Sequence, residues 1–312
     1  MAIQCRRFQG ESDYIKLRDF LQESVSLLGE KFYININDLE FAFDLYDNKS
    51  HLEAACEQLN NLVLWFEDEK IIGGIWIFNK MQLFINPEKK HIFNEILRVG
   101  EETVKEFIKE GKEFITMSDY SECKWCVFQG DNQLESALIA NGYYKTDEYW
   151  VLRNFDYSKA VEEPKLSEGY YIKTLAEISD LDKVIEMYRE CLGMGFDEYT
   201  LRNVNKFDTY REELDIVVMA PDGTPAALCS GRYDEKNKMA SFEAVACFRQ
   251  HRKKGLSKAM MLHALKAARA LGAEISTVLT LTPDQFPAPN RLYESVGFEL
   301  SGIKYIWKKI KE

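Results

Sequence analysis

The strongest constraint on the fold is that landmarks in the first half of the chain recur, in the same order, in the second half. The first is a polar turn between two apolar strand candidates, which begins at Glu67 and again at Pro221. The second is a Gly-x-x-x-x-Thr segment, which begins at Gly111 and Gly272, and the third is a glycine before an aromatic residue, at Gly142 and Gly297. The members of each pair lie about 155 residues apart, with the small differences in spacing that loop insertions produce. We therefore expect an internal duplication.

The duplication predicts two domains, residues 1–155 and 170–312, joined by a linker at 156–169 that is polar and contains Pro164 and Gly169. A chain of 312 residues is long enough for two domains of ordinary size. Strand candidates, among them 114–117 and paired strands at 143–153, alternate in both halves with helix candidates, among them 31–61 and 198–213. We expect an α/β (α+β) fold, in which each domain has a twisted, mixed but mostly antiparallel sheet flanked by helices.

The net charge and the cysteines limit the possible partners of the protein and the compartment in which it works. The net charge of −11 argues against a general nucleic-acid partner, and no apolar run is long enough to span a membrane. Seven scattered cysteines and the absence of an apolar signal core predict a cytoplasmic protein with reduced thiols. Cys123-x-x-Cys126 has no second ligand pair, so we expect buried thiols there and no metal.

The most informative segment is an apolar strand, Ser241–Cys247, followed by a basic turn and an amphipathic helix that extends to Leu271. Amide groups at a helix start have no intrahelical acceptor, and the helix dipole favours an anion there. Gly255 allows the backbone to approach a ligand, and Arg252, Lys253, Lys254 and Lys258 add positive charge. The segment alone predicts an anion site or a basic, solvated helix start.

This segment resembles the acyl-CoA pyrophosphate loop of the GNAT (Gcn5-related) N-acetyltransferases, Arg/Gln-x-x-Gly-x-Gly/Ala. It reads Arg252-x-x-Gly255-x-Ser257 here, with a small serine at the last position. About 40 residues later, Asn290, Tyr293 and Gly297-Phe298 match a second GNAT motif. Together the two segments resemble tandem GNAT proteins of the mycothiol synthase-like kind.

The resemblance implies two tandem GNAT-type domains and acetyl-CoA as co-substrate, without a metal. It implies that the backbone of 245–247 pairs with the pantetheine arm, that the loop amides hold the pyrophosphate, that Asn290 contacts the pantetheine, and that Tyr293 protonates the leaving thiolate. The cofactor-binding residues would be Val245, Ala246, Cys247, Arg252, Lys253, Lys254, Gly255, Leu256, Ser257, Lys258 and Asn290.

An amine nucleophile must lose a proton, and Glu243 lies two residues before the pantetheine-binding positions. It is therefore a candidate general base, directly or through water. A solvated or salt-bridged carboxylate on a strand is the alternative interpretation.

The first half lacks the residues that make the site. An alignment of its loop and of its final glycine puts Lys90, Phe93, Glu95 and Leu138 at the positions of Arg252, Gly255, Ser257 and Tyr293. A phenyl ring and a carboxylate are unsuited to a phosphate site, and leucine cannot donate a proton. We expect residues 1–155 to be a degenerate GNAT-like domain that does not bind CoA.

Three functions remain open at this point. They are an N-acyltransferase, which would transfer acetyl from acetyl-CoA to a primary amine of a small molecule or peptide; a non-catalytic acyl-CoA-binding regulatory module; and a tandem-GNAT aminoacyl-transferase. Tyr293 and Asn290 favour the first, with no nucleic-acid or membrane partner. The acceptor pocket is expected in the variable region 186–213, where Asp197, Glu198 and Asp208 could attract a cation. The acceptor and the oligomeric state do not follow from the sequence.

Overall fold

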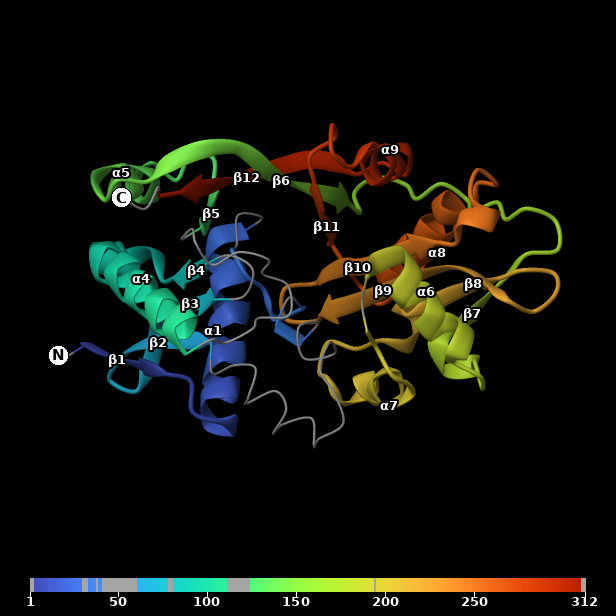
Figure 1. The fold of residues 1–312 in the computed structure, drawn as a ribbon. Helices are drawn as coiled ribbons and strands as arrows, with labels where there is room; N and C mark the ends of the chain where they lie inside the picture. The colour runs from blue at the N-terminus through green and yellow to red at the C-terminus, as the bar shows by residue number, and fades with distance from the viewer. Residues whose placement is uncertain are drawn as a thin grey trace. The chain divides into compact units, whose positions relative to one another are not determined.

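The computed structural model describes residues 3–29, 33–37, 39–40, 61–77, 81–110, 124–193 and 195–309. They form two compact units, drawn in Figure 1. Unit 1 comprises Met1–Asn35, Leu52–Val151 and Gly302–Glu312, and unit 2 comprises Ile36–His51 and Leu152–Ser301. The expected strand at 114–117 and most of the expected helix at 31–61 lie outside the described residues.

Unit 1 is a sheet with two long helices, α1 and α4, that both pack against its third strand, β3 (Figure 1). Its elements in chain order are β1 (Ile3–Arg7), α1 (Glu11–Leu28), β2 (Leu62–Glu67), β3 (Lys70–Ile77), β4 (Met81–Ile85), the 3-10 helix η2 (Pro87–Ile92), α4 (Phe93–Lys109), β5 (Lys124–Phe128) and α5 (Asn132–Ala140). β1 to β4 pair antiparallel, whereas β4 and β5 are parallel.

Unit 2 repeats this plan. Its elements are β7 (Tyr171–Thr174), η3 (Leu175–Glu177), α6 (Asp182–Leu192), α7 (Glu198–Asn203), η4 (Val204–Lys206), η5 (Glu212–Leu214), β8 (Ile216–Met219), β9 (Pro225–Asp234), β10 (Met239–Cys247), η6 (Arg249–His251), α8 (Leu256–Ala270), β11 (Ile275–Leu281) and α9 (Pro287–Ser295). Ile216 and Val218 of β8 pack with α8, whereas Val217 and Met219 pack with α6. Because successive strand residues point to opposite faces, α8 and α6 cover opposite faces of the sheet.

Two long strands pass from one unit into the other. β6 (Tyr144–Asp156) starts in unit 1 and ends in unit 2, and β12 (Glu299–Lys308) starts in unit 2 and ends in unit 1. The strand order is β1-β2-β3-β4-β5-β12-β6-β11-β10-β9-β8-β7. The units therefore differ from the expected sequential split into 1–155 and 170–312, since each includes strand residues from the other half of the sequence.

Several elements differ from the sequence prediction. The paired strands expected at 143–153 are one continuous strand, β6, which contains no glycine or proline to interrupt it. The helix expected at 198–213 ends at Asn203 and is followed by 3-10 turns. Asparagine and β-branched residues in 203–205 have weak helix propensity, which accounts for the early end.

The last of the repeated landmarks, the glycine before an aromatic residue, takes the same backbone geometry in both units. Gly142 and Gly297 have φ values of 80° and 99° and follow α5 and α9. In each case the next amide, that of Tyr143 or Phe298, bonds to the carbonyl five residues earlier, that of Leu138 or Tyr293. The structure thus places Leu138 where unit 2 has Tyr293. The Gly111 landmark lies outside the described residues.

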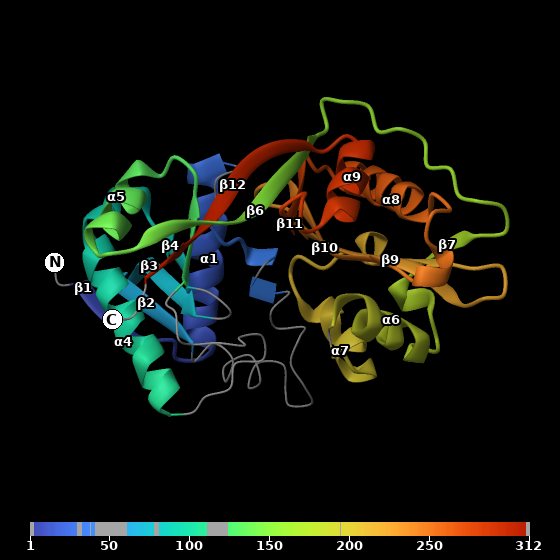
Figure 2. The ribbon, with the colours of Figure 1, turned by 45° about the horizontal axis from the view of Figure 1, so that its top comes forward.

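Residues 157–170 contain neither helix nor strand, in the place where the sequence predicts a linker. Figure 2 shows this segment passing α9 and α8 on its way to β7. Glu163 pairs with Lys266 on α8 at 2.6 Å, and Ser167 donates a hydrogen bond to the Lys254 carbonyl at 2.7 Å. The segment therefore lies along the start of α8. Among the helices within the described ranges, none is long and apolar enough to cross a membrane.

Candidate active site

The basic turn in unit 2 forms an open helix N-terminus. After η6 the backbone enters the left-handed region at Lys253 (φ 61°) and again at Gly255 (φ 74°), and α8 begins at Leu256 with Gly255 as its N-cap. No side chain caps this end of the helix, and a Cβ added at Gly255 would meet nothing within 4 Å. The amides of 256–258 therefore face open space at the positive end of the helix dipole, which is an arrangement that suits an anion.

Arg252, Lys254 and Lys258 have partners in unit 2. Arg252 folds back so that its Nε donates to the Cys247 carbonyl at 3.0 Å. Lys254 donates to the Tyr170 hydroxyl at 2.8 Å, and Lys258 pairs with Glu162 at 2.8 Å. Arg252, Lys253 and Lys254 are exposed, and Lys258 is half-buried. Leu256 packs in the core and anchors the helix start. Ser257 is half-buried and hydrogen-bonds to the Cys247 thiol. This bond lowers the pKa of the thiol, but burial raises that pKa by more.

β10, the strand that leads into this turn, separates from the parallel strand β11 along part of its length. β10 and β11 pair only from Met239–Ser241 with Ile275–Thr277, although β10 continues to Cys247 and β11 to Leu281. A β-bulge at Glu243–Ala244 shifts the register of β10 against β9 at this point. The backbone of 245–247 therefore borders a gap in the ladder, where an extended ligand can pair with it. The Ala246 side chain is buried in the cluster under α6, and Val245 and Cys247 are half-buried.

Tyr293 and Glu243 lie close enough to interact electrostatically. Tyr293 is buried on α9, 6% exposed, with its ring against Phe298. Burial raises the pKa of the Tyr293 hydroxyl well above its usual value, with smaller contributions from Cys229 and Glu243. Glu243 is exposed at the bulge. The tyrosine therefore keeps its proton at neutral and mildly alkaline pH, and the carboxylate beside it is accessible to solvent.

Asn290 has a structural position that the sequence did not predict. It is 2% exposed, and its amide nitrogen donates to the carbonyls of Leu281 at 3.0 Å and Phe286 at 2.8 Å. Its Oδ1 accepts from Arg153 at 3.2 Å, and Arg153 also pairs with Glu294 at 2.6 Å. Asn290 therefore ties the end of β11 to α9, the helix that carries Tyr293. Arg153 was missed because it lies far away in the sequence and joins the site only through β6.

Unit 1 has no such cradle within its described residues. η2 runs directly into α4, and Phe93 at the junction is helical, with φ −51°. Asn86 caps η2 by accepting from the Glu88 amide at 2.9 Å. Phe93 packs in the hydrophobic core rather than in the phosphate space, and Glu95 accepts a hydrogen bond from the Trp65 indole at 3.1 Å. The amides that correspond to the uncapped start of α8 in unit 2 are therefore capped or helical here.

In the part of the chain that the structure describes, no group of three or more histidine, cysteine or acidic side chains is arranged to hold a metal ion. Cys126 is a buried free thiol, and Cys123 lies outside the described residues.

Comparisons with known proteins agree with this geometry. Residues 181–298 match the model of the acetyltransferase (GNAT) family. A GCN5-related N-acetyltransferase from Sphaerobacter thermophilus is 14% identical, with a TM-score of 0.63 over 99% of this chain and 96% of that one. A tandem GNAT protein from the clavulanic acid biosynthesis pathway is 12% identical, with a TM-score of 0.64 over 98% of both chains. A GNAT-family acetyltransferase from Colwellia psychrerythraea is 12% identical, with a TM-score of 0.58 over 99% of this chain and all of that one.

A comparison with curated proteins gave no match. The structural matches cover both halves of the chain and show the tandem GNAT fold, whereas the family model identifies the second half; a closer relation to mycothiol synthase stays a prediction. Residues 181–298 therefore match the acetyltransferase (GNAT) family, and the chain as a whole has the fold of the tandem GNAT structures.

Proposed function

We propose that this protein transfers an acetyl group from acetyl-CoA to a primary amine of a small molecule or peptide, and that unit 2 performs the reaction. The observation that carries the proposal is a combination of two pairs of features in unit 2. One pair is an uncapped helix start at Gly255 and the separation of the parallel strands β10 and β11; the other is a buried tyrosine and a solvent-accessible carboxylate within electrostatic range of it. The first pair of features suits a phosphorylated, extended cofactor. The second pair supplies a proton donor and a proton acceptor.

In this proposal the amides of 256–258 and the basic side chains of the turn hold the pyrophosphate. The backbone of Val245 and Cys247 pairs with the pantetheine arm at the gap between β10 and β11. Acetyl-CoA supplies an activated thioester carbonyl. Asn290 acts by positioning α9, because its amide nitrogen already has two backbone acceptors.

Two residues move protons. Glu243 accepts a proton from the attacking ammonium group, directly or through water, and the resulting free amine attacks the carbonyl carbon. Tyr293 donates its hydroxyl proton to the sulfur as the C–S bond breaks. The attacking nitrogen loses its extra proton, which restores the phenol through water, so the products are the acetylated amine and neutral CoA thiol. The raised pKa of Tyr293 keeps this donor protonated over the pH range in which amines are reactive.

The five described cysteines, Cys5, Cys126, Cys191, Cys229 and Cys247, are free thiols. This pattern supports a reducing compartment, and we place the reaction in the cytoplasm.

The test compares Tyr293→Phe with Tyr157→Phe. Tyr157 is a second buried tyrosine of the same hydrophobic cluster, and its hydroxyl bonds to Ser276 at 2.7 Å. Single-turnover thiol release from acetyl-CoA, measured against a panel of amines, amino acids, polyamines and amino sugars, should fall by roughly 10²–10³ in Tyr293→Phe. CoA affinity should not change, because the cradle is untouched.

Tyr157→Phe should transfer acetyl at the wild-type rate. Any alkaline decrease in the wild-type rate that is due to Tyr293 should lie above pH 10, since burial raises its pKa, and should be absent in the phenylalanine variant. Wild-type turnover in Tyr293→Phe would refute the acid role, and the absence of transfer to every amine would refute the function.

A further inference from the structure

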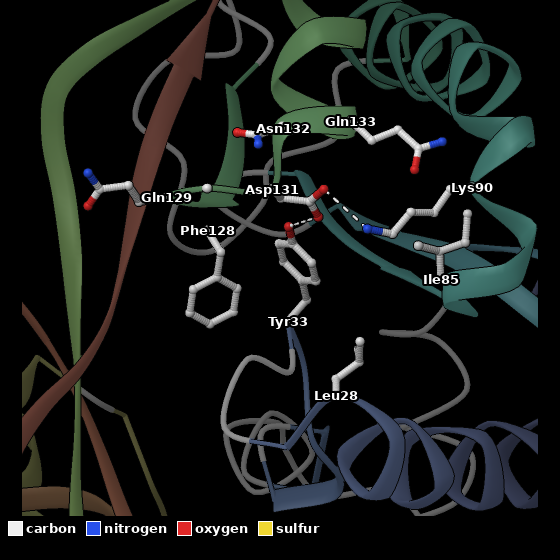
Figure 3. Close-up of a pocket in the computed structure, with 10 residues that line it drawn as sticks. Leu28, Tyr33, Ile85, Lys90, Phe128, Gln129, Asp131, Asn132 and Gln133 are labelled. Atoms are coloured by element: carbon white, nitrogen blue, oxygen red, sulfur yellow. Dashed lines mark hydrogen bonds and ion pairs between the residues drawn. The ribbon is translucent and has the colours of Figure 1, made fainter.

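Unit 1 contains a cavity of about 280 Å³ that the proposed reaction does not use (Figure 3). It is lined by Leu28 and Tyr33 from the α1 end, Ile85 at the end of β4, Lys90 in η2, and residues 128–133 where β5 turns into α5. All of these residues belong to unit 1. The volume is close to the lower end of the range for small-molecule sites, which suggests a ligand of metabolite size.

The cavity occupies the position that the cofactor cleft has in unit 2. β4 and β5 are parallel and pair at Met81 and Trp125, near their starts, and their last residues, Ile85 and Phe128, both line the cavity. The two strands separate toward this end, as β10 and β11 do. Unit 1 thus retains the cleft of the repeated fold, although the capped η2 gives it no amides for a pyrophosphate.

The charged groups of the cavity form a pair at one end. Asp131 accepts a hydrogen bond from the Tyr33 hydroxyl at 2.7 Å and pairs with the Lys90 ammonium at 3.2 Å. Figure 3 shows the three side chains converging, with Leu28, Ile85 and Phe128 around the space beside them. The pair is largely buried, since the side chains of Lys90 and Asp131 are 25% and 12% exposed. The cavity therefore offers one positive and one negative group next to an apolar wall.

The wall is held in place by a strand from the far end of the chain. Lys304 of β12 donates to the Tyr33 carbonyl at 2.9 Å and lies 4.7 Å from the centre of the Phe128 ring. Lys304 is itself buried. Tyr33 and Phe128 are thus fixed from behind, which makes the cavity a formed site rather than a gap between side chains.

We propose that this cavity binds a free α-amino acid with an apolar side chain. Its ammonium group would pair with Asp131, its carboxylate with Lys90, and its side chain would contact Leu28, Ile85 and Phe128. A zwitterion suits a site in which Lys90 and Asp131 carry opposite charges. On binding, each of these side chains exchanges its present partner for a charged group of the ligand, and no buried charge is left unpaired. CoA would require several uncompensated cations, whereas the cation among the described lining residues, Lys90, is already paired with Asp131.

The experiment is calorimetry on the full chain with L-leucine as the probe. We expect one leucine per chain. Isopentylamine and 4-methylpentanoate, which each retain one of the two charged groups, should bind at least about tenfold more weakly, because a hydrogen bond to a charged group is lost. L-Glutamate should also bind weakly, because its second carboxylate would meet the apolar wall.

Variants assign the binding to unit 1. Asp131→Asn keeps the N-cap of α5, since asparagine caps helices as well as aspartate does, but removes the charge and should weaken binding about 10- to 100-fold. Leu28→Trp should fill the cavity and abolish binding, whereas Leu27→Trp is the matched control because Leu27 is 61% exposed and does not line this cavity.

Glu243→Gln distinguishes this site from the acceptor site of unit 2, where leucine could also bind as an amine, because it removes the carboxylate that would meet the ammonium group there. Leucine binding should be unchanged in Glu243→Gln. No binding at millimolar leucine, equal binding of the single-charge analogues, or unaltered binding to Asp131→Asn would overturn the proposal. If Leu28→Trp does not fold, Asp131→Asn still decides. None of these outcomes depends on whether unit 2 transfers acetyl groups.

Discussion

Gly255 is the residue whose replacement tests the cofactor site most directly. Any other residue at φ 74° is strained by about 1–2 kcal/mol, because a Cβ disfavours the left-handed region. No packing is lost in addition, since a Cβ there would meet nothing within 4 Å. Gly255→Glu should therefore fold, with a free energy of unfolding lower by about this amount.

Its effect on CoA should be far larger. The new carboxylate would stand in front of the amides of 256–258 and repel the pyrophosphate. A loss of two amide–phosphate hydrogen bonds, at about 1.5–3 kcal/mol each, weakens binding at least about a hundredfold. Gly255→Gln has the same volume without the charge, so the difference between the two variants measures the electrostatic part.

Gly193 is the matched control. It has φ 70° and ψ 19° after α6, Gly255 has φ 74° and ψ 1°, and neither has a neighbour within 4 Å of an added Cβ. Gly193→Glu should lose the same stability and keep CoA affinity. Calorimetry should give one CoA per wild-type chain. Two equivalent sites, or equal CoA affinity in the two glutamate variants, would refute the reasoning.

Three further changes have defined outcomes. Glu162→Gln frees Lys258 for the phosphates and should tighten CoA binding about threefold at low salt, with a smaller gain at high salt, as titrations at two ionic strengths would show. Arg153→Met removes the partner of the buried Asn290 and should lower single-turnover transfer by roughly tenfold without changing CoA affinity, because α9 loses its anchor. Asp13→Asn should cost about 2 kcal/mol of unfolding free energy at pH 7, measured with urea, because Asp13 is 2% exposed and accepts two hydrogen bonds from Arg6.

The same contacts determine how the contribution of Asp13 to stability depends on pH. Burial alone would raise the pKa of the Asp13 carboxyl, but the hydrogen bonds from Arg6 and Gln9 outweigh it, and the pKa is lowered. Its contribution to stability is therefore present above the unfolded-state pKa near 3.9 and is lost as the pH falls through the lower folded-state value. The difference in stability between the wild type and Asp13→Asn should shrink in acid.

Parts of the structure that depend on local chemistry could be predicted from the sequence. Gly297 and Gly255 mark a helix end and a helix start because only glycine adopts positive φ without strain, and both have the expected geometry. The tandem GNAT fold was implied by the resemblance of the two motifs to the GNAT family and is confirmed by the structural matches. The roles of Glu243, Tyr293 and the loop residues stay predictions.

Features that depend on distant parts of the chain were not predictable. Arg153 contacts Asn290 because it lies on β6, and the alternation of apolar and polar residues along this strand does not show which strand pairs with it. The unit 1 cavity combines Tyr33, Lys90 and Asp131, which have no common motif. Similarly, nothing in the pattern of residues 302–308 indicates that they pair with β5 rather than within their own half.

The exchange of β6 and β12 has a consequence for how the protein is made. Residues 302–308 complete unit 1 beside β5, yet they are synthesised after all of unit 2. A nascent chain on the ribosome therefore exposes the β5 edge of a nearly finished sheet while the whole of unit 2 is being translated. Unit 1 can close only after unit 2 has been synthesised, so the usual order, in which the N-terminal domain folds first, does not apply to this chain.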